Sequence, residues 1–545
     1  MSSSPCHTAF DAAPGQGEHV HEFNVGPLGR GRRARCGDGA TAGVRRGASL
    51  GLTAALVVTG ALSTTGPAGA TGDDDYVSQA GGVPGTPEPG DLLGSAVAIG
   101  DFNGDGYDDA AIGAPGEAIG PRTGAGAVNV LYGTGVGLTN YASQFWSQDS
   151  TGVPGGSETG DRFGAALAAG DFNDDGRDEL AIGVPGEAIG SIQQAGMVNI
   201  LVGSNSGLTG SPLTIHQNRP GVDGACEPGD QFGSSLATGG IGGREDDLFV
   251  GVPHEDLGTR SDAGMAHFIP GFPGEGPEYP GGLSLPEEFA FHQDSWGVPT
   301  AARANEQFGA SFAVADFTGD ARGDVAVSAP REAVDGGEGY GPNGGVVFMI
   351  PGDVDRPVLG EGIVKTDGID QLSDATDRYF GQDLAVRMRG SSPTSDLVVG
   401  VRDSIQGPGG GAEVFRYDGD PSGEGLTPII GHPSSADPGR AVAGRAQGFY
   451  SNESSGVLVG IPELTEGGAA RAGAVDGWPG VFGQVQSPGS SETDDRFGHD
   501  LAIGDLDGDG IDDLLIGVPG EDIETVADAG GAVVGYGANL PDPFS

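Results

Sequence analysis

The side chains of this chain best suited to chemistry are acidic residues that recur at a fixed spacing in four short segments. Each segment follows the pattern D-x-[DNT]-x-D-x-x-x-[DE]. In such a segment the side chains at positions 1, 3 and 5 converge in a tight turn. The main-chain carbonyl at position 7 and a carboxylate at position 9 complete a set of hard oxygen ligands, which favours Ca²⁺ over Zn²⁺ or Mg²⁺. Because such closely packed carboxylates repel one another without a cation, the pattern predicts four calcium sites.

The predicted ligands come from four units of the chain, and position 7 contributes only its carbonyl oxygen. They are Asp101, Asn103, Asp105, Tyr107 and Asp109 in the first unit; Asp171, Asn173, Asp175, Arg177 and Glu179 in the second; Asp316, Thr318, Asp320, Arg322 and Asp324 in the fourth; and Asp505, Asp507, Asp509, Ile511 and Asp513 in the seventh. The fourth-unit segment has Thr318 at position 3 and Ala321 where the others have Gly. Whether it holds calcium is therefore left open, although we count it among the four.

Three further units lack these ligands. The third unit has Gly239, Ile241 and Gly243 at the ligand positions, and the fifth and sixth have none around residues 387–396 and 449–457. We expect these three units to bind no cation there.

The acidic segments belong to a longer repeat. Its Phe-Gly step, or a remnant of it, occurs at Leu93, Phe163, Phe232, Phe308, Phe380, Ala441 and Phe497. Neighbouring clear copies lie roughly 70 residues apart, which indicates stacked or radially arranged units. We count seven units between residues 76 and 537.

Each unit is predicted to form four short strands, because short apolar runs alternate with Gly, Pro and Asp and no helical period appears. In the second unit they cover 163–168, 180–184, 196–202 and 214–217, and the fourth strand of the unit before covers 144–147. Seven units of four strands predict an all-β fold, a seven-bladed β-propeller. A β-solenoid is the competing architecture, but its coils are usually shorter.

The two ends of the repeat region complement each other. The last unit stops after its third strand at 531–536, while residues 76–79 resemble 145–148 at the end of the first unit. The N-terminal strand is therefore predicted to close the ring as the outer strand of the seventh blade, which would remove an exposed sheet edge.

Residues 1–71 are predicted to be an upstream segment and a secretory signal. Arg45 and Arg46 precede an apolar stretch over 48–62, and a small-residue cleavage motif ends near Ala70. We therefore expect a secreted protein without a membrane span, with a propeller over 72–540 and a tail over 541–545. The true start codon and the export route stay open.

Composition narrows the class of partner. The chain has 77 acidic and 26 basic residues, a formal net charge of −51 at pH 7. Binding to the phosphates of nucleic acid depends on basic surfaces, so nucleic acid is excluded as a partner. Of the three cysteines, Cys6 and Cys36 precede the predicted cleavage point and Cys226 remains alone, so no intrachain disulfide is expected. Bound calcium is the natural alternative stabiliser.

Three motifs together resemble FG-GAP repeats. They are the Phe-Gly step, the acidic loop, and a Gly-x-Pro step at 113–115, 183–185, 251–253 and 517–519. FG-GAP repeats build the seven-bladed head of integrin α subunits and occur in bacterial secreted proteins. The resemblance implies a propeller with calcium on one face and ligand binding on the other, but not animal-type cell adhesion. Calcium-binding units cluster in the later blades of integrins, whereas here they are the first, second, fourth and seventh.

Ligand binding is expected on the face opposite the acidic loops, where connecting loops are longer and more varied. These loops are 117–124, 187–195, 254–263, 331–344 and the segment around Trp296; the candidate contact residues are His254, Trp296, Arg331 and Tyr340. We expect a monomeric extracellular binding or adhesion module for protein or polysaccharide. No catalytic motif of recognised spacing appears, so a secreted hydrolase or lyase acting on polysaccharide or ester is the alternative.

Overall fold

The computed structural model describes residues 75–537 except 243–244, 275–280, 296–297, 299, 333–343, 354–355, 358–362, 366–379, 388–393, 402–410, 418–425, 432–441, 444–457, 461–470, 478–479, 484–491 and 524. All of them lie in the second of the two units into which the chain divides, Ala68–Ser545. The fold is all-β, as predicted. The helical elements within the described residues are two single 3-10 turns, η1 (Gln79–Gly81) and η2 (Leu285–Glu287).

Seven four-stranded antiparallel sheets account for most strands of the described chain. The first three comprise β2 (Ala96–Gly100), β3 (Asp109–Ala114), β4 (Ala127–Tyr132) and β5 (Thr139–Trp146); β6 (Ala166–Gly170), β7 (Glu179–Val184), β8 (Met197–Val202) and β9 (Thr209–Ile215); and β10 (Ser235–Gly239), β11 (Asp247–Val252), β12 (Met265–Ile269) and β15 (Phe289–Phe291). In each of them the strands pair in chain order.

The next three sheets follow the same order. They comprise β16 (Phe312–Ala315), β17 (Asp324–Ala329), β18 (Val346–Ile350) and β21 (Ile363–Lys365); β22 (Phe380–Arg387), β23 (Asp396–Val401), β24 (Gly411–Tyr417) and β25 (Leu426–Gly431); and β26 (Val442–Ala443), β27 (Leu458–Gly460), β28 (Ala474–Gly477) and β29 (Gly480–Gly483). Two small hairpins stand apart from the sheets: β13 (Gly271–Phe272) with β14 (Gly282–Leu283), and β19 (Gly352–Asp353) with β20 (Arg356–Pro357).

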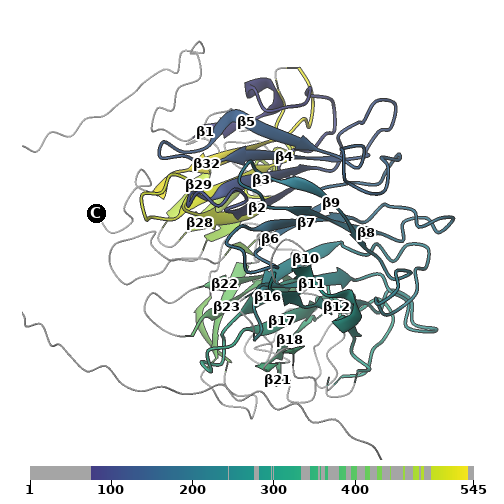
Figure 1. Ribbon diagram of the computed structural model, residues 1–545. Coiled ribbons are helices and arrows are strands. Elements are labelled where there is room, and N and C mark those ends of the chain that lie inside the picture. The colour runs from purple at the N-terminus through teal and green to yellow at the C-terminus, as the bar shows by residue number, and fades with distance from the viewer. Residues whose placement is uncertain are drawn as a thin grey trace, which may run out of the picture. The chain divides into compact units, whose positions relative to one another are not determined.

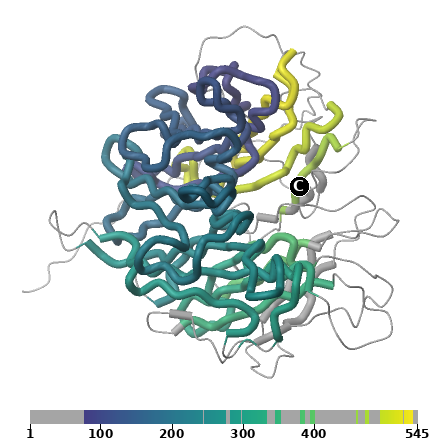
Figure 2. Tube along the Cα trace, turned by 90° about the vertical axis from the view of Figure 1, so that its right-hand side faces the viewer, coloured from purple at the N-terminus to yellow at the C-terminus, as the bar shows by residue number. Residues whose placement is uncertain are grey.

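The last sheet joins the two ends of the described chain. It contains β30 (Leu501–Gly504), β31 (Asp513–Val518), β32 (Gly531–Gly535) and β1 (Asp75–Val77), with Tyr76 opposite Val533. In Figure 2 the purple start of the described chain lies beside its yellow end. Just after β1, the Gln79 Nε2 donates to Glu117 of the first unit at 2.6 Å, and Gln148 after β5 does the same to Glu187 of the second at 2.6 Å. The Gln79 bond thus joins the N-terminal segment to the first unit in the same way that the Gln148 bond joins the fourth strand of the first unit to the second unit.

The first strands of successive sheets are neighbours. Contacts join β2 to β6, β6 to β10, β10 to β16 and β16 to β22 (Figure 1). They continue from β22 to β26 and from β26 to β30, and β30 also contacts β2. Close approach depends on glycine. A Cβ added to Gly113 of the Gly-x-Pro step would lie 2.1 Å from the Gly164 carbonyl oxygen of the next Phe-Gly step, and one at Gly183 would lie 2.2 Å from that of Gly233. The two motifs of the repeat therefore meet where one unit packs on the next.

The core lies within and between the sheets. Every residue of the second strands β3, β7, β11, β17 and β31 is buried, which explains their continuous apolar runs, whereas the outer strand β5 is partly exposed. One cluster joins Val128 and Val130 of the first sheet to Phe163, Ile182 and Leu201 of the second unit. Burial of such side chains contributes about 1.5–3 kcal/mol each.

Three predicted strand starts are wrong by three to five residues. The predicted first strand 163–168 is observed as β6, which begins only at Ala166, because Arg162 and Gly164 have φ of 60° and 85° and cannot continue a strand. Phe163 instead forms an isolated bridge to Gly126 and is fully buried. The fourth strands are predicted to begin at 144 and 214. The observed strands β5 and β9 begin earlier, at Thr139 and Thr209.

Candidate metal centre

The four acidic segments form the turns between the first and second strands of their sheets. We name them loop 1 (101–109), loop 2 (171–179), loop 4 (316–324) and loop 7 (505–513), after their units. Position 1 of each loop directly follows a first strand, and position 9 is the first residue of the second strand. The strand pairing therefore brings the two ends of each loop together.

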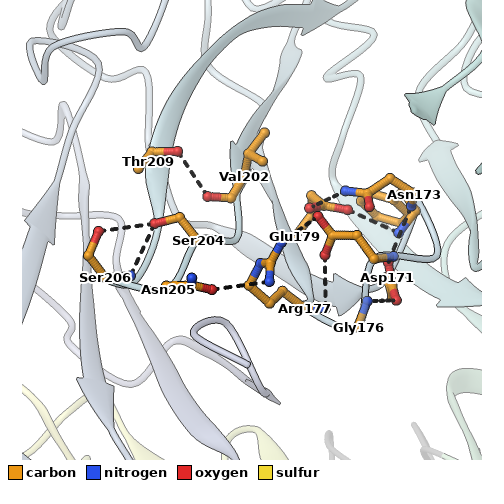
Figure 3. A network of polar contacts seen from close by, with 12 residues as sticks. Asp171, Asn173, Gly176, Arg177, Glu179, Val202, Ser204, Asn205, Ser206 and Thr209 are labelled. Carbon is orange, nitrogen blue, oxygen red and sulfur yellow. Dashed lines mark hydrogen bonds and ion pairs between the residues drawn. The ribbon is translucent and has the colours of Figure 1, made fainter. Parts of the chain in front are cut away.

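The position-1 aspartate organises the turn. In loop 1, Asp101 Oδ1 accepts the main-chain N–H groups of Gly104 and Asp105 at 2.7 and 3.2 Å, and its Oδ2 accepts that of Gly106 at 2.9 Å. Asp171 makes the matching bonds to Asp175 and Gly176 in loop 2 (Figure 3). Position 6 has a positive φ in both loops, which Gly adopts without strain. Loop 4 has Ala321 there at φ 67°, so it keeps the shape at some cost in strain.

The position-9 carboxylate has a role that the sequence did not reveal. Asp109 is fully buried, and its two oxygens accept the N–H of Phe102 at 3.0 Å and of Gly133, after β4, at 2.9 Å. Asp324 and Asp513 make the same pair of bonds in loops 4 and 7. This residue therefore ties the loop to the end of the third strand, whether or not it also contacts a cation.

Loop 3 shows that this tie does not need the other ligands. Its Asp247 accepts the N–H of Ile241 at 2.9 Å and of Gly271 at 3.0 Å. Ile241 thus occupies the buried position 2, filled by Phe102 in loop 1, and loop 3 runs over 240–247 with one residue fewer. The predicted register, with Ile241 at position 3, is wrong by one residue. Gly240 and Gly242 still offer no side-chain ligand.

Loop 7 has the donors best suited to a cation. Asp505, Asp507 and Asp513 each offer a carboxylate oxygen, and these oxygens lie within 4.8 Å of one another, the one group of three acidic side chains so close in the described part of the chain. The Asp505 Oδ1 is buried without a hydrogen-bond partner. Asp509 stands outside the group and accepts the N–H of Ile511 at 2.8 Å. Three carboxylates with an unpartnered oxygen fit a hard divalent cation.

Loop 2 also leaves an oxygen without a partner. The Asn173 Nδ2 donates to Glu179 Oε1 at 2.9 Å, while the Asn173 Oδ1 is buried and accepts nothing (Figure 3). Arg177, predicted to contribute its carbonyl, places its side chain on the position-5 carboxylate, with Nη2 2.9 Å from Asp175 Oδ2. In loop 4 the Arg322 Nη1 lies 4.0 Å from Asp320. Loops 2 and 4 therefore each hold a positive charge of their own, which loops 1 and 7 replace with Tyr107 and Ile511.

The position-9 carboxyl groups are buried beside other carboxylates, and their pKa values are raised. Burial, followed by the charges of Asp101 and Asp105, raises the pKa of Asp109 to about 8. Burial with Asp175 and Asp171 raises the pKa of Glu179 to about 8, and burial raises that of Asp513 to about 7. A bound cation would favour the ionised forms. The residues of loops 1, 2 and 7 thus fit Ca²⁺, and loop 4 fits it with a Thr in place of one carboxylate or amide.

Sequence comparison identifies the repeat. The FG-GAP repeat family matches residues 93–131, 163–201 and 497–535. This chain carries FG-GAP repeats. The three matched FG-GAP segments contain loops 1, 2 and 7, the three whose donor sets are most complete.

Proteins with related sequences match only part of this FG-GAP chain. It is 34% identical to phosphatidylinositol-glycan-specific phospholipase D of Bos taurus over 181 residues, which are 33% of this chain and 21% of that protein. It is 32% identical to integrin alpha-PS5 of Drosophila melanogaster over 170 residues, 30% of this chain and 15% of that protein. The chain therefore matches about a fifth or less of these relatives.

Among solved structures, the FG-GAP chain resembles rhamnogalacturonan lyase YesW with a TM-score of 0.40 and 12% identity, covering 85% of this chain and 76% of that one. This likeness is too weak to carry a functional argument. In the described residues of the FG-GAP chain, no helix has the length and apolar character to span a membrane.

The four residues proposed for ligand contact are only partly described. His254 Nδ1 lies 2.9 Å from Asp262 Oδ1, and the His254 side chain is 32% exposed. The Arg331 N–H donates to the Glu306 carbonyl at 3.4 Å. Trp296 and Tyr340 lie outside the described residues. The described residues therefore place two of the four candidate contact residues, and their assembly into one site stays a prediction.

Proposed function

We propose that this chain is a secreted β-propeller, stabilised by calcium, that acts as an extracellular binding or adhesion module for a protein or polysaccharide. The observation that carries the proposal is the set of acidic turns, and above all the three clustered carboxylates of loop 7 with the unpartnered Asp505 Oδ1. The Ca²⁺ ions would be held by the carboxylate, amide and hydroxyl oxygens at positions 1, 3, 5 and 9 and the carbonyl at position 7. Bound calcium would supply positive charge that neutralises these turns.

We further propose that the seven sheets are blades of one closed ring. Support comes from the unbroken series of contacts between first strands, which returns from β30 to β2, and from the pairing of β1 with β32. The last and first units are also joined farther out, because the Tyr536 hydroxyl accepts the Leu138 N–H at 2.9 Å. Tyr132 makes the same bond to Leu208 of the second unit at 2.9 Å. The junction between the chain's ends thus repeats an ordinary junction between units.

Deleting residues 72–80 tests the closed ring. Val77 is buried against Val534 in one core cluster, and Gln79 satisfies the buried Glu117, so the deletion should lower the melting temperature sharply. Full burial of a Val side chain alone contributes about 1.5–3 kcal/mol. A matched deletion of eight or nine residues within the predicted leader should leave the melting temperature unchanged. An unchanged melt after removal of 72–80 would refute the ring.

Export and partner class rest on the sequence. The predicted signal before Ala70, the net charge of −51 and the lone buried Cys226 suit an extracellular, calcium-rich environment without nucleic acid. We propose a monomer that binds through the loops between second and third strands, where His254 and Arg331 lie. This chain covers 21% of the phospholipase D and 15% of integrin alpha-PS5, so the proposed recognition role rests on the FG-GAP repeats and not on the whole activity of either relative.

The deciding experiment is a calcium titration of the full chain by isothermal titration calorimetry, with melting temperature as a second readout. We expect up to four Ca²⁺ per chain with dissociation constants of about 0.1–1 mM. Absence of both binding heat and a calcium-dependent rise in melting temperature would contradict the proposal. Glycan arrays and pull-downs from cell-wall fractions, each with and without calcium, then search for the ligand. Release of product from a polysaccharide or ester panel would instead support an enzyme.

A further inference from the structure

Hydrogen bonds from the residue at position 8 join neighbouring loops. The ligand pattern assigns no cation ligand to this position. The N–H at position 8 of one loop donates to the position-1 carbonyl of the loop before it. The bonds are Asp108 to Asp505 at 3.0 Å, Asp178 to Asp101 at 3.0 Å, Asp246 to Asp171 at 2.9 Å, and Ser395 to Asp316 at 2.8 Å. The acidic turns of consecutive units are therefore connected through their backbones.

At three of these junctions a carboxylate returns the bond. The position-1 N–H groups of Asp505, Asp101 and Asp171 donate to the Oδ2 atoms of Asp108, Asp178 and Asp246 at 2.9, 2.9 and 3.3 Å. We name Asp108, Asp178 and Asp246 the junction carboxylates. Each one holds, from the following unit, the residue that supplies the first predicted cation ligand of the preceding loop.

The glycine just before position 1 makes room for this arrangement. A Cβ added to Gly100 would lie 2.4 Å from Asp178 Oδ2, one at Gly504 would lie 2.5 Å from Asp108 Oδ2, and one at Gly170 would lie 3.0 Å from Asp246 Oδ2. None of these glycines has a positive φ, so their lack of a side chain serves space rather than backbone conformation. The Gly-Asp pair that opens loops 1, 2 and 7 thus leaves space for the junction carboxylate of the following unit, which accepts the N–H of the aspartate.

Two described junctions have no carboxylate at position 8, and in both the preceding loop has a less complete set of ligands than loops 1, 2 and 7. Loop 4 has Gly323 at position 8, and the loop before it is loop 3, which has no side-chain ligands at positions 1 to 5. Ser395 follows loop 4, whose preceding residue is Ala315 rather than Gly and whose ligand set is the least complete. At the described junctions the carboxylate and the glycine therefore occur together, beside loops 1, 2 and 7. Asp512 holds position 8 of loop 7, and the turn of the unit before it lies outside the described residues.

From this geometry we infer that the junction carboxylates are positioning residues for calcium in the preceding loop, and that they do not serve their own loop. This inference rests on the proposed function. Each carboxylate fixes the main chain of the position-1 aspartate, so that its side-chain oxygens stand ready for the cation. Groups that orient metal ligands in this way typically change metal affinity by roughly 10–100-fold when removed.

Asp246 offers the clearest test, because it lies in loop 3, which has no cation ligands of its own at positions 1, 3 and 5. Calcium titration of the full-length D246A protein should show one site weakened by roughly 10-fold, with the others unchanged. D246N, which keeps an acceptor oxygen, should weaken that site less. The matched control is E245Q, which removes the adjacent charge and should change every affinity by less than about twofold because it leaves the junction bond in place.

A second background assigns the weakened site. In D171N/D175N, which lacks two ligands of loop 2, one calcium ion should be lost, and D246A should then change none of the remaining affinities. G100A should shift the Asp178 carboxylate without altering any charge, and should weaken the loop 1 site. Its effect should vanish in D101N/D105N.

Three outcomes are separable. Wild-type protein that binds no calcium defeats the proposed function and this inference with it. Wild-type binding that D246A and G100A leave within twofold overturns the inference alone. A D246A effect that persists in D171N/D175N also overturns it, because the carboxylate would then act on a site other than loop 2. If D246A fails to fold, D246N and G100A provide the same decision.

Discussion

Loop 1 and loop 3 occupy equivalent turns and both carry a junction carboxylate at position 8, Asp108 or Asp246. Within the turn itself they share two further features. Both bury an apolar side chain at position 2, Phe102 or Ile241, and both end on a buried aspartate that accepts two main-chain N–H groups. Loop 1 adds Asp101 and Asp105, whereas loop 3 has glycine at its start and is one residue shorter. Loop 3 therefore forms its turn with the buried pair and without aspartates at positions 1 and 5, whereas loop 1 also uses Asp101 to order its main chain.

This difference separates two roles within one acidic pattern. Position 9 is structural first, because Asp247 keeps it where no cation is predicted. Positions 1 and 5 place further carboxylates beside the position-9 group, and in loops 1 and 2 their charges add to the burial that raises the pKa of Asp109 and Glu179. Because a bound cation would favour the ionised carboxylates, the two roles can be tested apart.

Calcium removal should have the largest effect. With Ca²⁺ at 10 mM and dissociation constants of about 0.1–1 mM, each occupied site stabilises the folded state by about 1.4–2.7 kcal/mol. Chelation should therefore lower the melting temperature in differential scanning calorimetry. The quadruple variant D105N/D175N/D320N/D507N should melt alike with and without calcium. A full calcium shift in that variant would place the cations outside these loops.

Removal of the buried aspartate should come next. D247A leaves the N–H groups of Ile241 and Gly271 without their acceptor, at about 1–3 kcal/mol for each unsatisfied buried group. We expect a loss of about 2–6 kcal/mol in urea unfolding, equal with calcium and with chelator. D109A should lose a similar amount in chelator and more in calcium. If D247A and D109A lost the same unfolding free energy in calcium, loop 1 and loop 3 would not differ in cation binding.

The sequence was sufficient for the repeat, the all-β class and the acidic turns, because apolar runs, glycines and carboxylates follow local rules. It misplaced the start of β6, since the Phe-Gly step is a turn with positive φ at Arg162 and Gly164. It also missed that Asp109 bonds Gly133 and that Asp178 bonds Asp101, because both contacts join segments distant in the chain. Single-residue register in loop 3 depended on the same long-range bonds.

The pH dependence of stability should reveal the buried aspartate of loop 3. Burial raises the pKa of Asp247 to about 7, despite two N–H donors, with Asp246 and Glu245 adding to the rise. The folded protein then holds a proton that the unfolded chain releases above its ordinary pKa of about 4. This contribution is fully present below pH 4 and is lost as pH rises through 7.

Measured in chelator between pH 5 and 8, wild-type protein should lose on the order of 2 kcal/mol more stability than D247N, whose amide does not titrate in that range. Calcium should leave this difference between the two proteins intact, because loop 3 has no cation ligands at positions 1, 3 and 5. Parallel pH profiles of wild type and D247N would show that Asp247 stays ionised throughout.

The smallest effect should come from exchanging position 7 between loops. Arg177 lies 2.9 Å from Asp175 and so offers loop 2 a charge that competes with a cation, while loop 1 has Tyr107 at that place. R177Y should strengthen calcium binding at loop 2 by a few-fold, since a partly exposed ion pair is worth about 0–1 kcal/mol. The same variant should slightly lower stability in chelator, because Asp175 loses its partner. Y107R should do the reverse in loop 1. If R177Y weakened calcium binding instead, the Arg177 guanidinium would help to order the turn. Loop 2 would then resemble loop 3, whose turn is held by protein contacts, more than loop 1.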